Sequence, residues 1–313
     1  MRAVRHARYG GPEVLQIVDV DAPTPGRGEV LVRVHAAALN PKDVLVRKGK
    51  FRWFTFGAWP RATGLDLCGE VIAVGAGVTQ ARVGERVWAM LPGWLGGAVQ
   101  ERAVVPEGCC GTAPASLSDA QAAAVPLAAL TALQALRDDA RVGRGARVVI
   151  HGASGGVGTF AIQLAKDLGA HVTTTSGAAN HALCRELGAD ETLDYRVDDP
   201  LARRDAWDCV FDVFGNRSFA HARAALAAGG TYVTTVPSPQ IVVDTARTLV
   251  GGKRARLVVV RSRRVDLDHL AARVAAGALR PVVDRVFPMD QIVDAHRYLA
   301  TKRARGKVVI TIS

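Results

Sequence analysis

Short segments in which apolar and polar residues alternate dominate the N-terminal part of the chain. Clear examples are residues 28–34, 69–74 and 85–89, with glycine- and proline-rich turns between them. A period of two residues is typical of strands that bury one face. We therefore predict a β-rich domain over residues 1–118.

A second pattern begins after Ser118, a suitable N-cap for the alanine-rich helix predicted over residues 119–136. Helical segments then alternate with apolar runs. The predicted strands are 147–150, 171–175, 191–195, 208–213, 231–236 and 257–260. Continuous apolar strands between helices are typical of a parallel sheet that is covered on both faces.

The tail of the chain changes pattern again. It reads as a helix (266–276), a strand (282–287), a helix (289–301) and a last strand (307–312). This leaves open a return of the tail to the first domain.

Composition bounds the class of protein. The chain has 313 residues, which suggests about two domains. Of these residues 49% are hydrophobic and 22% charged, enough for each domain to bury a hydrophobic core. No stretch approaches the roughly 18–20 apolar residues that a membrane helix needs. Residues 1–10 carry charges where a signal peptide would be apolar. We expect a cytoplasmic protein without a membrane partner.

The net charge of +11 would suit nucleic acid, an acidic membrane surface or an anionic cofactor. The arginines are scattered through every segment, and the densest cluster, over residues 254–264, flanks an apolar strand. No zinc-finger, helix-turn-helix or RNP motif accompanies them. We interpret the charge as a solvated surface and expect no nucleic-acid partner.

Residues 147–158 read as a strand, a glycine turn and the start of a helix. Aligned on G-x-G-x-x-G, Ala153 takes the first position, Gly155 the second and Gly158 the third. The second glycine would let the backbone approach a pyrophosphate, and the third would let helix pack on strand. An ordinary tight turn is the alternative, but four more strand signals follow, which favours dinucleotide binding.

The choice of cofactor depends on the end of the second strand, where NAD enzymes usually place an acid. Here the strand runs into Ser176, Asn180 and His181, without a carboxylate. An acid would repel a 2′-phosphate and these side chains can donate to one, which favours NADPH. The stretch also lacks Arg and Lys, so a polar loop before the helix over 182–187 is the alternative.

Several motifs in this order carry a family resemblance. Residues 9–15, 28–34, 40–43, 125–132 and 151–158 together resemble the zinc-free quinone oxidoreductase (zeta-crystallin-like) branch of the medium-chain dehydrogenase/reductase superfamily, nearly end to end. The resemblance implies an α/β fold class, with a GroES-like β-rich catalytic domain and a Rossmann domain built on a doubly wound parallel sheet.

In that fold, residues 1–118 and 266–313 form the catalytic domain, residues 119–265 bind NADPH, and the active-site cleft lies between them. The resemblance also implies hydride transfer from NADPH to a quinone or an α,β-unsaturated carbonyl, and a homodimer.

The resemblance also implies roles for single residues. Asn40 and Asp43 match the polar pair that faces the substrate. The matching cofactor positions are Thr131 near the nicotinamide, Ser154, Gly155, Gly156, Val157 and Gly158 at the pyrophosphate, Ser176 and Tyr195 at the adenosine phosphate, Phe214 and Val236 at strand ends, and Lys307 before the last strand. Local alternatives stay open, since Asn40 and Asp43 could simply build an Asx-type turn.

The sequence departs from zinc-dependent relatives at their metal ligands. Leu39-Asn40 and Gly64-Leu65-Asp66 stand where those relatives have a Cys and a Gly-His-Glu, and a catalytic zinc needs three ligands. We therefore expect no metal. Reduction of an already polarised conjugated acceptor suits such a site, because it needs no Lewis acid.

Residues 51–59 hold five aromatic side chains, in a chain with only 5% aromatics. A flat apolar substrate could stack on Trp53 or Phe56. The alternative is that these residues anchor their loop or form a dimer contact.

Two other functions stay open. An enoyl-thioester reductase would use the same cofactor and fold. A non-catalytic NADPH-binding redox sensor or structural protein would keep every cofactor position.

Overall fold

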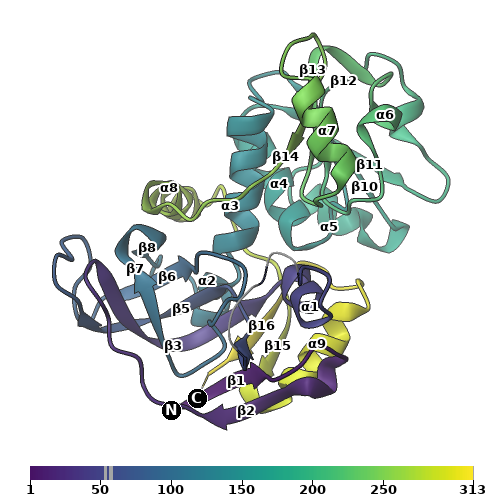
Figure 1. Cartoon of the computed structure of the whole chain (residues 1–313). Coiled ribbons are helices and arrows are strands. Elements are labelled where there is room, and N and C mark those ends of the chain that lie inside the picture. The colour runs from purple at the N-terminus through teal and green to yellow at the C-terminus, as the bar shows by residue number, and fades with distance from the viewer. Residues whose placement is uncertain (53–54, 56–58, 313) are drawn as a thin grey trace. The chain divides into compact units, whose positions relative to one another are not determined.

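The described strands form one large, mostly antiparallel sheet, one large parallel sheet and a third, smaller sheet (Figure 1). The computed structural model describes residues 1–52, 55 and 59–312. Unit 1 comprises Met1–Leu127, Arg261–Gly277 and Pro281–Ser313, and unit 2 comprises Ala128–Val260 and Ala278–Arg280. We predicted boundaries after residues 118 and 265, whereas the structure keeps residues 119–127 and 261–265 in unit 1.

Unit 1 is built around the long strand β3 (Glu29–Leu39). Its seven-stranded sheet has the order β15-β16-β3-β5-β6-β8, and β7 also pairs with β3. The partner strands are β5 (Asp66–Val74), β6 (Arg86–Met90), β7 (Arg102–Pro106), β8 (Cys110–Thr112), β15 (Val283–Pro288) and β16 (Lys307–Thr311). A three-stranded sheet of β2 (Leu15–Asp19), β1 (Arg2–His6) and β4 (Arg61–Ala62) completes the unit.

Most helical elements of unit 1 are short. They are η1 (Pro12–Val14), α1 (Pro41–Arg47), η2 (Glu107–Cys109), α2 (Asp119–Ala123), α8 (Arg264–Ala275), η6 (Met289–Gln291) and α9 (Ile292–Ala300). Helix α3 (Pro126–Gln134) starts in unit 1 and continues into unit 2.

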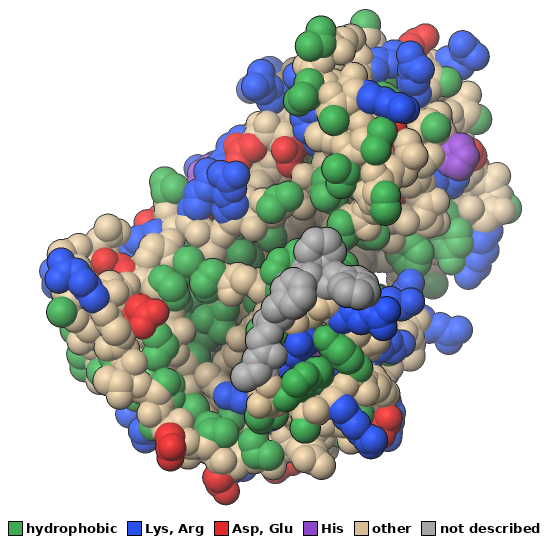
Figure 2. All heavy atoms as spheres, viewed as in Figure 1, with side chains coloured by type: hydrophobic (Ala, Val, Ile, Leu, Met, Phe, Trp, Pro, Cys, Tyr) green, Lys and Arg blue, Asp and Glu red, His purple; other side chains and the backbone are tan. Residues whose placement is uncertain are grey.

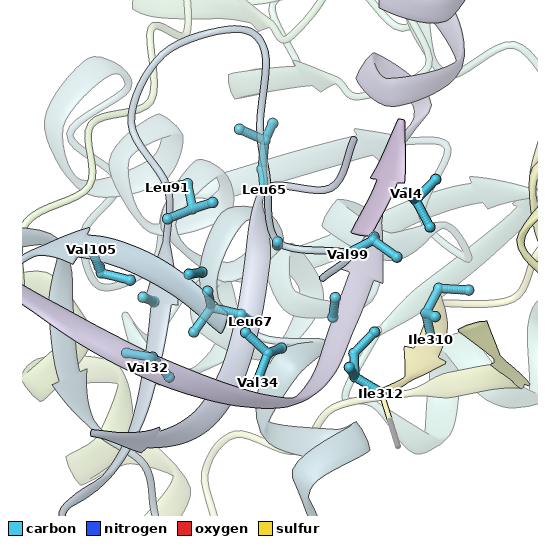
Figure 3. Close-up of a cluster of buried hydrophobic side chains, with 14 of the residues drawn as sticks. Val4, Val32, Val34, Leu65, Leu67, Leu91, Val99, Val105, Ile310 and Ile312 are labelled. Atoms are coloured by element: carbon cyan, nitrogen blue, oxygen red, sulfur yellow. The ribbon is translucent and has the colours of Figure 1, made fainter. Parts of the chain in front are cut away.

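Both ends of the chain contribute to the core of unit 1. Val4, Val34, Leu67 and Ile310 come from β1, β3, β5 and β16 and are buried in one cluster (Figure 3). Burying one such side chain contributes about 1.5–3 kcal/mol, so the last strand is an integral part of this unit. Strand β16 pairs antiparallel with β3, with Val308 opposite Leu39.

Unit 2 contains a parallel six-stranded sheet of order β11-β10-β9-β12-β13-β14. The strands are β9 (Arg147–His151), β10 (His171–Ser176), β11 (Glu191–Asp194), β12 (Trp207–Asp212), β13 (Leu226–Thr234) and β14 (Arg254–Leu257). The chain leaves β9 first towards β10 and later returns to its other side at β12. Ligands of such sheets bind outside the carboxyl ends of the strands at this switch point.

The helical elements of unit 2 connect these strands. They are η3 (Ala135–Asp139), α4 (Gly156–Asp167), η4 (Ala178–Asn180), α5 (His181–Glu186), η5 (Pro200–Ala202), α6 (Phe219–Ala222) and α7 (Pro239–Arg247). None of the described helices is long and apolar enough to span a bilayer. The predicted α/β fold, with a β-rich part and a separate parallel sheet flanked by helices, is confirmed.

The bounds of several predicted elements differ from the structure, and two of these differences have a clear physical reason. The helix predicted over residues 119–136 is split into α2 and α3, because Pro126 has no N–H to continue the first helix. The strand predicted over 257–260 is β14 at Arg254–Leu257, where it pairs with Thr231–Thr234 of β13. The bounds of β14 are set by its pairing with β13, and the run of valines that suggested a strand lies largely beyond its end.

Candidate functional site

The glycine turn lies at the carboxyl end of β9 and leads into α4, with Gly155 as N-cap. Gly152 has a φ of 77°, which favours glycine. A Cβ on Gly158 would overlap the carbonyl oxygen of Gly152 and lie 2.6 Å from the Cα of Ala153, so only glycine lets the helix approach the strand this closely. Gly158 therefore holds the position that the motif predicted for it.

The same turn leaves room for an anionic group. A Cβ on Gly155 would meet only the Gly152 carbonyl oxygen, at 3.4 Å, so the backbone is open on that side. The first turn of α4 contains no acidic residue. Helix N-termini with exposed N–H groups favour phosphate, so these residues fit the pyrophosphate of a dinucleotide.

The side chains after β10 are tied to this turn. Nδ2 of Asn180 donates to Oγ of Ser154 at 3.0 Å. Ser176 is buried, and its hydroxyl donates to the carbonyl of Gly177 at 3.3 Å. Asn180 thus holds the ribose end of the predicted site against its pyrophosphate end, while Ser176 turns towards its own loop.

Two charged residues at this edge were missed in the sequence. Strand β11 pairs with β10 so that Asp194 lies opposite Ser176. Nη2 of Arg196 lies 4.0 Å from the position that a Cβ on Gly177 would take. The carboxylate of Asp194 accepts backbone N–H groups from Ala178 at 3.3 Å and from Arg196 at 3.0 Å. The sequence did contain a signal for Arg196, which closely follows the predicted strand 191–195. Neighbouring parallel strands end at the same edge of a sheet, so a charged residue after one strand lies near the end of the other.

The remaining predicted cofactor residues of unit 2 differ in exposure. Tyr195 and Phe214 are 56% and 51% exposed, and Val236 is exposed as well. Phe214 packs near Gly152, where a Cβ on the glycine would lie 3.1 Å from the Phe214 Cβ. Thr131 is buried on α3. Phe214 therefore lies at the glycine turn, and its side chain is largely accessible.

His151, the last residue of β9, is a buried group that the sequence did not single out. Its Nδ1 atom lies 2.9 Å from Oγ1 of Thr175 on β10. Burial lowers the pKa of His151 to about 4, and the positive charge of Arg217 adds to this effect against the opposing charge of Asp212. The imidazole is neutral at pH 7 and joins the two strands that carry the turn.

The predicted substrate pair lies in unit 1, at the start of α1. The Asp43 carboxylate accepts the backbone N–H of Asn40 at 2.7 Å and that of Gly64 at 3.0 Å. Burial, with a smaller contribution from the nearby Asp66 carboxylate, raises the pKa of Asp43 to about 6, against the two N–H donors and Lys307. Asp43 therefore builds the local turn, which is the structural alternative noted for it.

Asn40 has different neighbours. Its Nδ2 atom donates to Oδ2 of Asp66 at 2.9 Å, and its Oδ1 atom accepts from Nζ of Lys307. Lys307 also lies 3.1 Å from Oδ2 of Asp66. Asn40 and Lys307 are each 3% exposed and Asp66 is 0% exposed. The structure thus brings two predicted residues together with Asp66.

The aromatic segment is described only in part. Trp53 and Phe56 lie outside the described residues, so their predicted substrate contact stays a prediction. Phe51 packs against Trp94 with ring centroids 5.0 Å apart. Trp59 stacks edge-on against Tyr9 at 4.9 Å, with the Arg61 guanidinium 4.2 Å from its ring. These two members of the segment pack against unit 1 itself.

Among the described residues, no group of three or more His, Cys, Asp or Glu side chains is placed to hold a metal ion. Lys and Arg side chains are spread over the visible face without forming one continuous patch (Figure 2). The homodimer and the cytoplasmic location stay predictions.

Comparisons with known proteins identify the family of the chain. Residues 26–115 match the alcohol dehydrogenase GroES-like domain, and residues 187–310 match the zinc-binding dehydrogenase family. The chloroplast envelope quinone oxidoreductase homolog of Arabidopsis thaliana is 33% identical over 99% of this chain and 98% of its own length. The mitochondrial NAD(P)H oxidoreductase RTN4IP1 of Mus musculus is 34% identical over 91% of this chain and 82% of its own length.

Solved structures show the same fold over the whole chain. The quinone oxidoreductase from Coxiella burnetii has a TM-score of 0.89 and 33% identity, and the match covers 100% of this chain and 99% of that one. A mycobacterial protein complexed with NADPH has a TM-score of 0.85 and 29% identity, covering 99% of both chains. The chain therefore belongs to the quinone oxidoreductase branch of the medium-chain dehydrogenase/reductase superfamily, a family of nicotinamide-dependent oxidoreductases.

Proposed function

We propose that this protein reduces quinones and α,β-unsaturated carbonyls with NADPH. The family membership supports the reaction class, and the glycine turn of α4 fits a dinucleotide. The bound nicotinamide supplies a hydride, and the protein contributes binding, orientation and electrostatics.

The observation that carries the choice of NADPH is the place of Arg196. Its guanidinium lies beside Gly177, directly after β10. Residues 176–181 themselves contain no Lys or Arg. Asp194 is the opposing charge at this edge, but its carboxylate already accepts two backbone N–H groups. A guanidinium binds phosphate oxygens in a fork geometry that a ribose hydroxyl does not need. Arg196 therefore favours a 2′-phosphate.

Asn40 is the residue that we assign to the acceptor. Its Nδ2 atom carries two N–H groups, and one of them is bound to Asp66. The second can donate to a carbonyl oxygen, where negative charge develops as hydride adds to the conjugated system. Asp43 supports the turn that presents Asn40, and water supplies the proton.

The test is the initial rate of NADPH and, separately, NADH oxidation with 9,10-phenanthrenequinone and with a simple enone, in the presence of EDTA. We expect fast NADPH oxidation that EDTA leaves unchanged, and slow NADH oxidation. Equal rates with NADPH and NADH would contradict the proposed role of Arg196 in selecting NADPH. Tight NADPH binding without turnover of either acceptor would instead support a redox sensor, and turnover restricted to conjugated thioesters would support an enoyl-thioester reductase.

A further inference from the structure

Three neighbouring strands of unit 1 bring Asn40, Asp66 and Lys307 together. The sheet order is β16-β3-β5. Val308 of β16 lies opposite Leu39 of β3, and Asp66 of β5 lies opposite Ala38. Lys307 immediately precedes Val308, and Asn40 immediately follows Leu39. The register of the sheet therefore places a cation on one side of Asn40 and an anion on the other.

The two charges hold opposite ends of the Asn40 amide. The carbonyl oxygen accepts from the Lys307 ammonium, and the amide nitrogen donates to the Asp66 carboxylate at 2.9 Å. A flipped amide would point its N–H groups at an ammonium, which only donates, and its oxygen at a carboxylate, which only accepts. Only one orientation of the amide is therefore compatible with its neighbours.

Asp66 is itself fixed. Its Oδ2 atom binds Asn40 and Lys307, and its Oδ1 atom accepts the backbone N–H of Leu127 at 2.6 Å, in the first turn of α3. Both oxygens are in use, so the carboxylate has no freedom to turn away from the amide. The arrangement is buried, and charge-assisted hydrogen bonds are strong there.

We propose that Asp66 and Lys307 are positioning residues for the reaction, which together fix the direction in which Asn40 donates its second N–H to the acceptor oxygen. This inference rests on the proposed function. It replaces direct cofactor binding as the role of Lys307, because two of the three ammonium protons of Lys307 already serve Asn40 and Asp66.

The test compares Lys307→Gln with Lys307→Met. Both remove the charge with side chains of similar length, but only the glutamine amide can still donate to the Asn40 oxygen. We expect Lys307→Met to lower kcat roughly 10- to 100-fold, since misplacement of about 1 Å can have such an effect. Lys307→Gln should recover part of that loss. The Kd of NADPH, measured by fluorescence titration, should change less than about twofold in both variants.

A double-mutant cycle with Asn40→Ala separates positioning from direct action. If Lys307 acts through Asn40, Lys307→Met in the Asn40→Ala background should lower kcat no further. The proposal would be overturned if the two substitutions lowered kcat by factors that multiply in the double variant. It would also be overturned if Lys307→Met raised the Kd of NADPH and left kcat at saturating cofactor unchanged. Lys307→Arg, which keeps a cation beside Asp66, is the second variant if the neutral ones do not fold, and it should lower kcat at unchanged NADPH affinity.

A readout without turnover distinguishes this proposal from the proposed function. In protein labelled with ¹⁵N-asparagine, the Asn40 side-chain N–H signals, assigned by their loss in Asn40→Ala, should exchange slowly with water. In Lys307→Met they should exchange at least about tenfold faster. Slow exchange that is lost in this variant would support the fixed amide even if no quinone were reduced. Equal exchange in both proteins would overturn it even in an active enzyme.

Discussion

Nζ of Lys307 lies 3.1 Å from Oδ2 of Asp66, and the two residues are 241 positions apart in the chain. Both side chains are buried, so each charge depends on the other for compensation. Removing one partner of a buried pair leaves the other charge unpaired, whereas replacing both is often tolerated.

The first prediction follows from this burial. Lys307→Met should lower the free energy of unfolding by about 3–5 kcal/mol, and Asp66→Asn combined with Lys307→Met should recover much of that loss. Urea denaturation monitored by fluorescence measures both effects. The matched control is Lys166→Met, because Lys166 pairs with Asp190 at 2.8 Å and the two side chains are 36% and 30% exposed. Its loss should be about 0–1 kcal/mol. Equal losses at the two lysines would contradict the buried-pair interpretation.

Features formed by residues close together in the sequence could be predicted, and features formed by distant residues could not. The strands around β9 and the turn at Gly155 and Gly158 could be predicted, because their signals are local and their spacing is fixed. The cluster around Asn40 could not be assembled, since Asp66 and Lys307 reach it only through strand register. Arg196 was missed for the same reason.

The glycine turn gives a matched pair of variants. Gly155→Ala adds a Cβ that meets only one protein atom within 4 Å, at a φ of −82° that any residue adopts. Its stability should change by less than about 0.5 kcal/mol. The methyl group would still occupy the open side of the turn, so the Kd of NADPH should rise about tenfold or more.

Gly158→Ala should show the opposite balance. Its methyl group would overlap the Gly152 carbonyl in the contact between helix and strand, so a loss of about 1–3 kcal/mol is expected. Thermal melts and fluorescence titrations of both variants provide the comparison. A stable Gly158→Ala protein, or unchanged NADPH affinity in Gly155→Ala, would show that the turn differs from this geometry.

Cofactor selectivity provides the next prediction. Arg196→Ala should raise KM for NADPH about 10-fold or more and leave KM for NADH within about twofold, because one charge-assisted contact to phosphate contributes about 1.5–3 kcal/mol. Arg203→Ala is the control, since Arg203 pairs with Glu191 at the opposite end of β11. Asp194→Asn should shift the preference further towards NADPH, by removing a negative charge from the same edge. A parallel rise of both KM values in Arg196→Ala would indicate a general effect on the loop.

A buried histidine makes stability depend on pH. His296 on α9 is fully buried, and within the described part of the chain neither of its ring nitrogens has a hydrogen-bond partner. Burial, together with the charges of Arg47 and His6, lowers its pKa from 6.5 to about 3.

The folded state therefore binds fewer protons than the unfolded chain between pH 6.5 and 3. The contribution of His296 to stability is complete above pH 6.5 and is lost progressively as the pH falls towards 3. His296→Leu removes this dependence. Between pH 7 and 5 the variant should lose roughly 2 kcal/mol less stability than the parent protein.

Urea midpoints at pH 7, 6 and 5 measure this difference. Asp43, whose raised pKa makes its own contribution grow as the pH falls through about 6, is present in both proteins and cancels in the comparison. The exposed His269 on α8 provides the control, and His269→Leu should follow the parent protein at each pH. If His296→Leu loses as much stability as the parent on acidification, then His296 is protonated in the folded protein and must have a partner that its surroundings do not show.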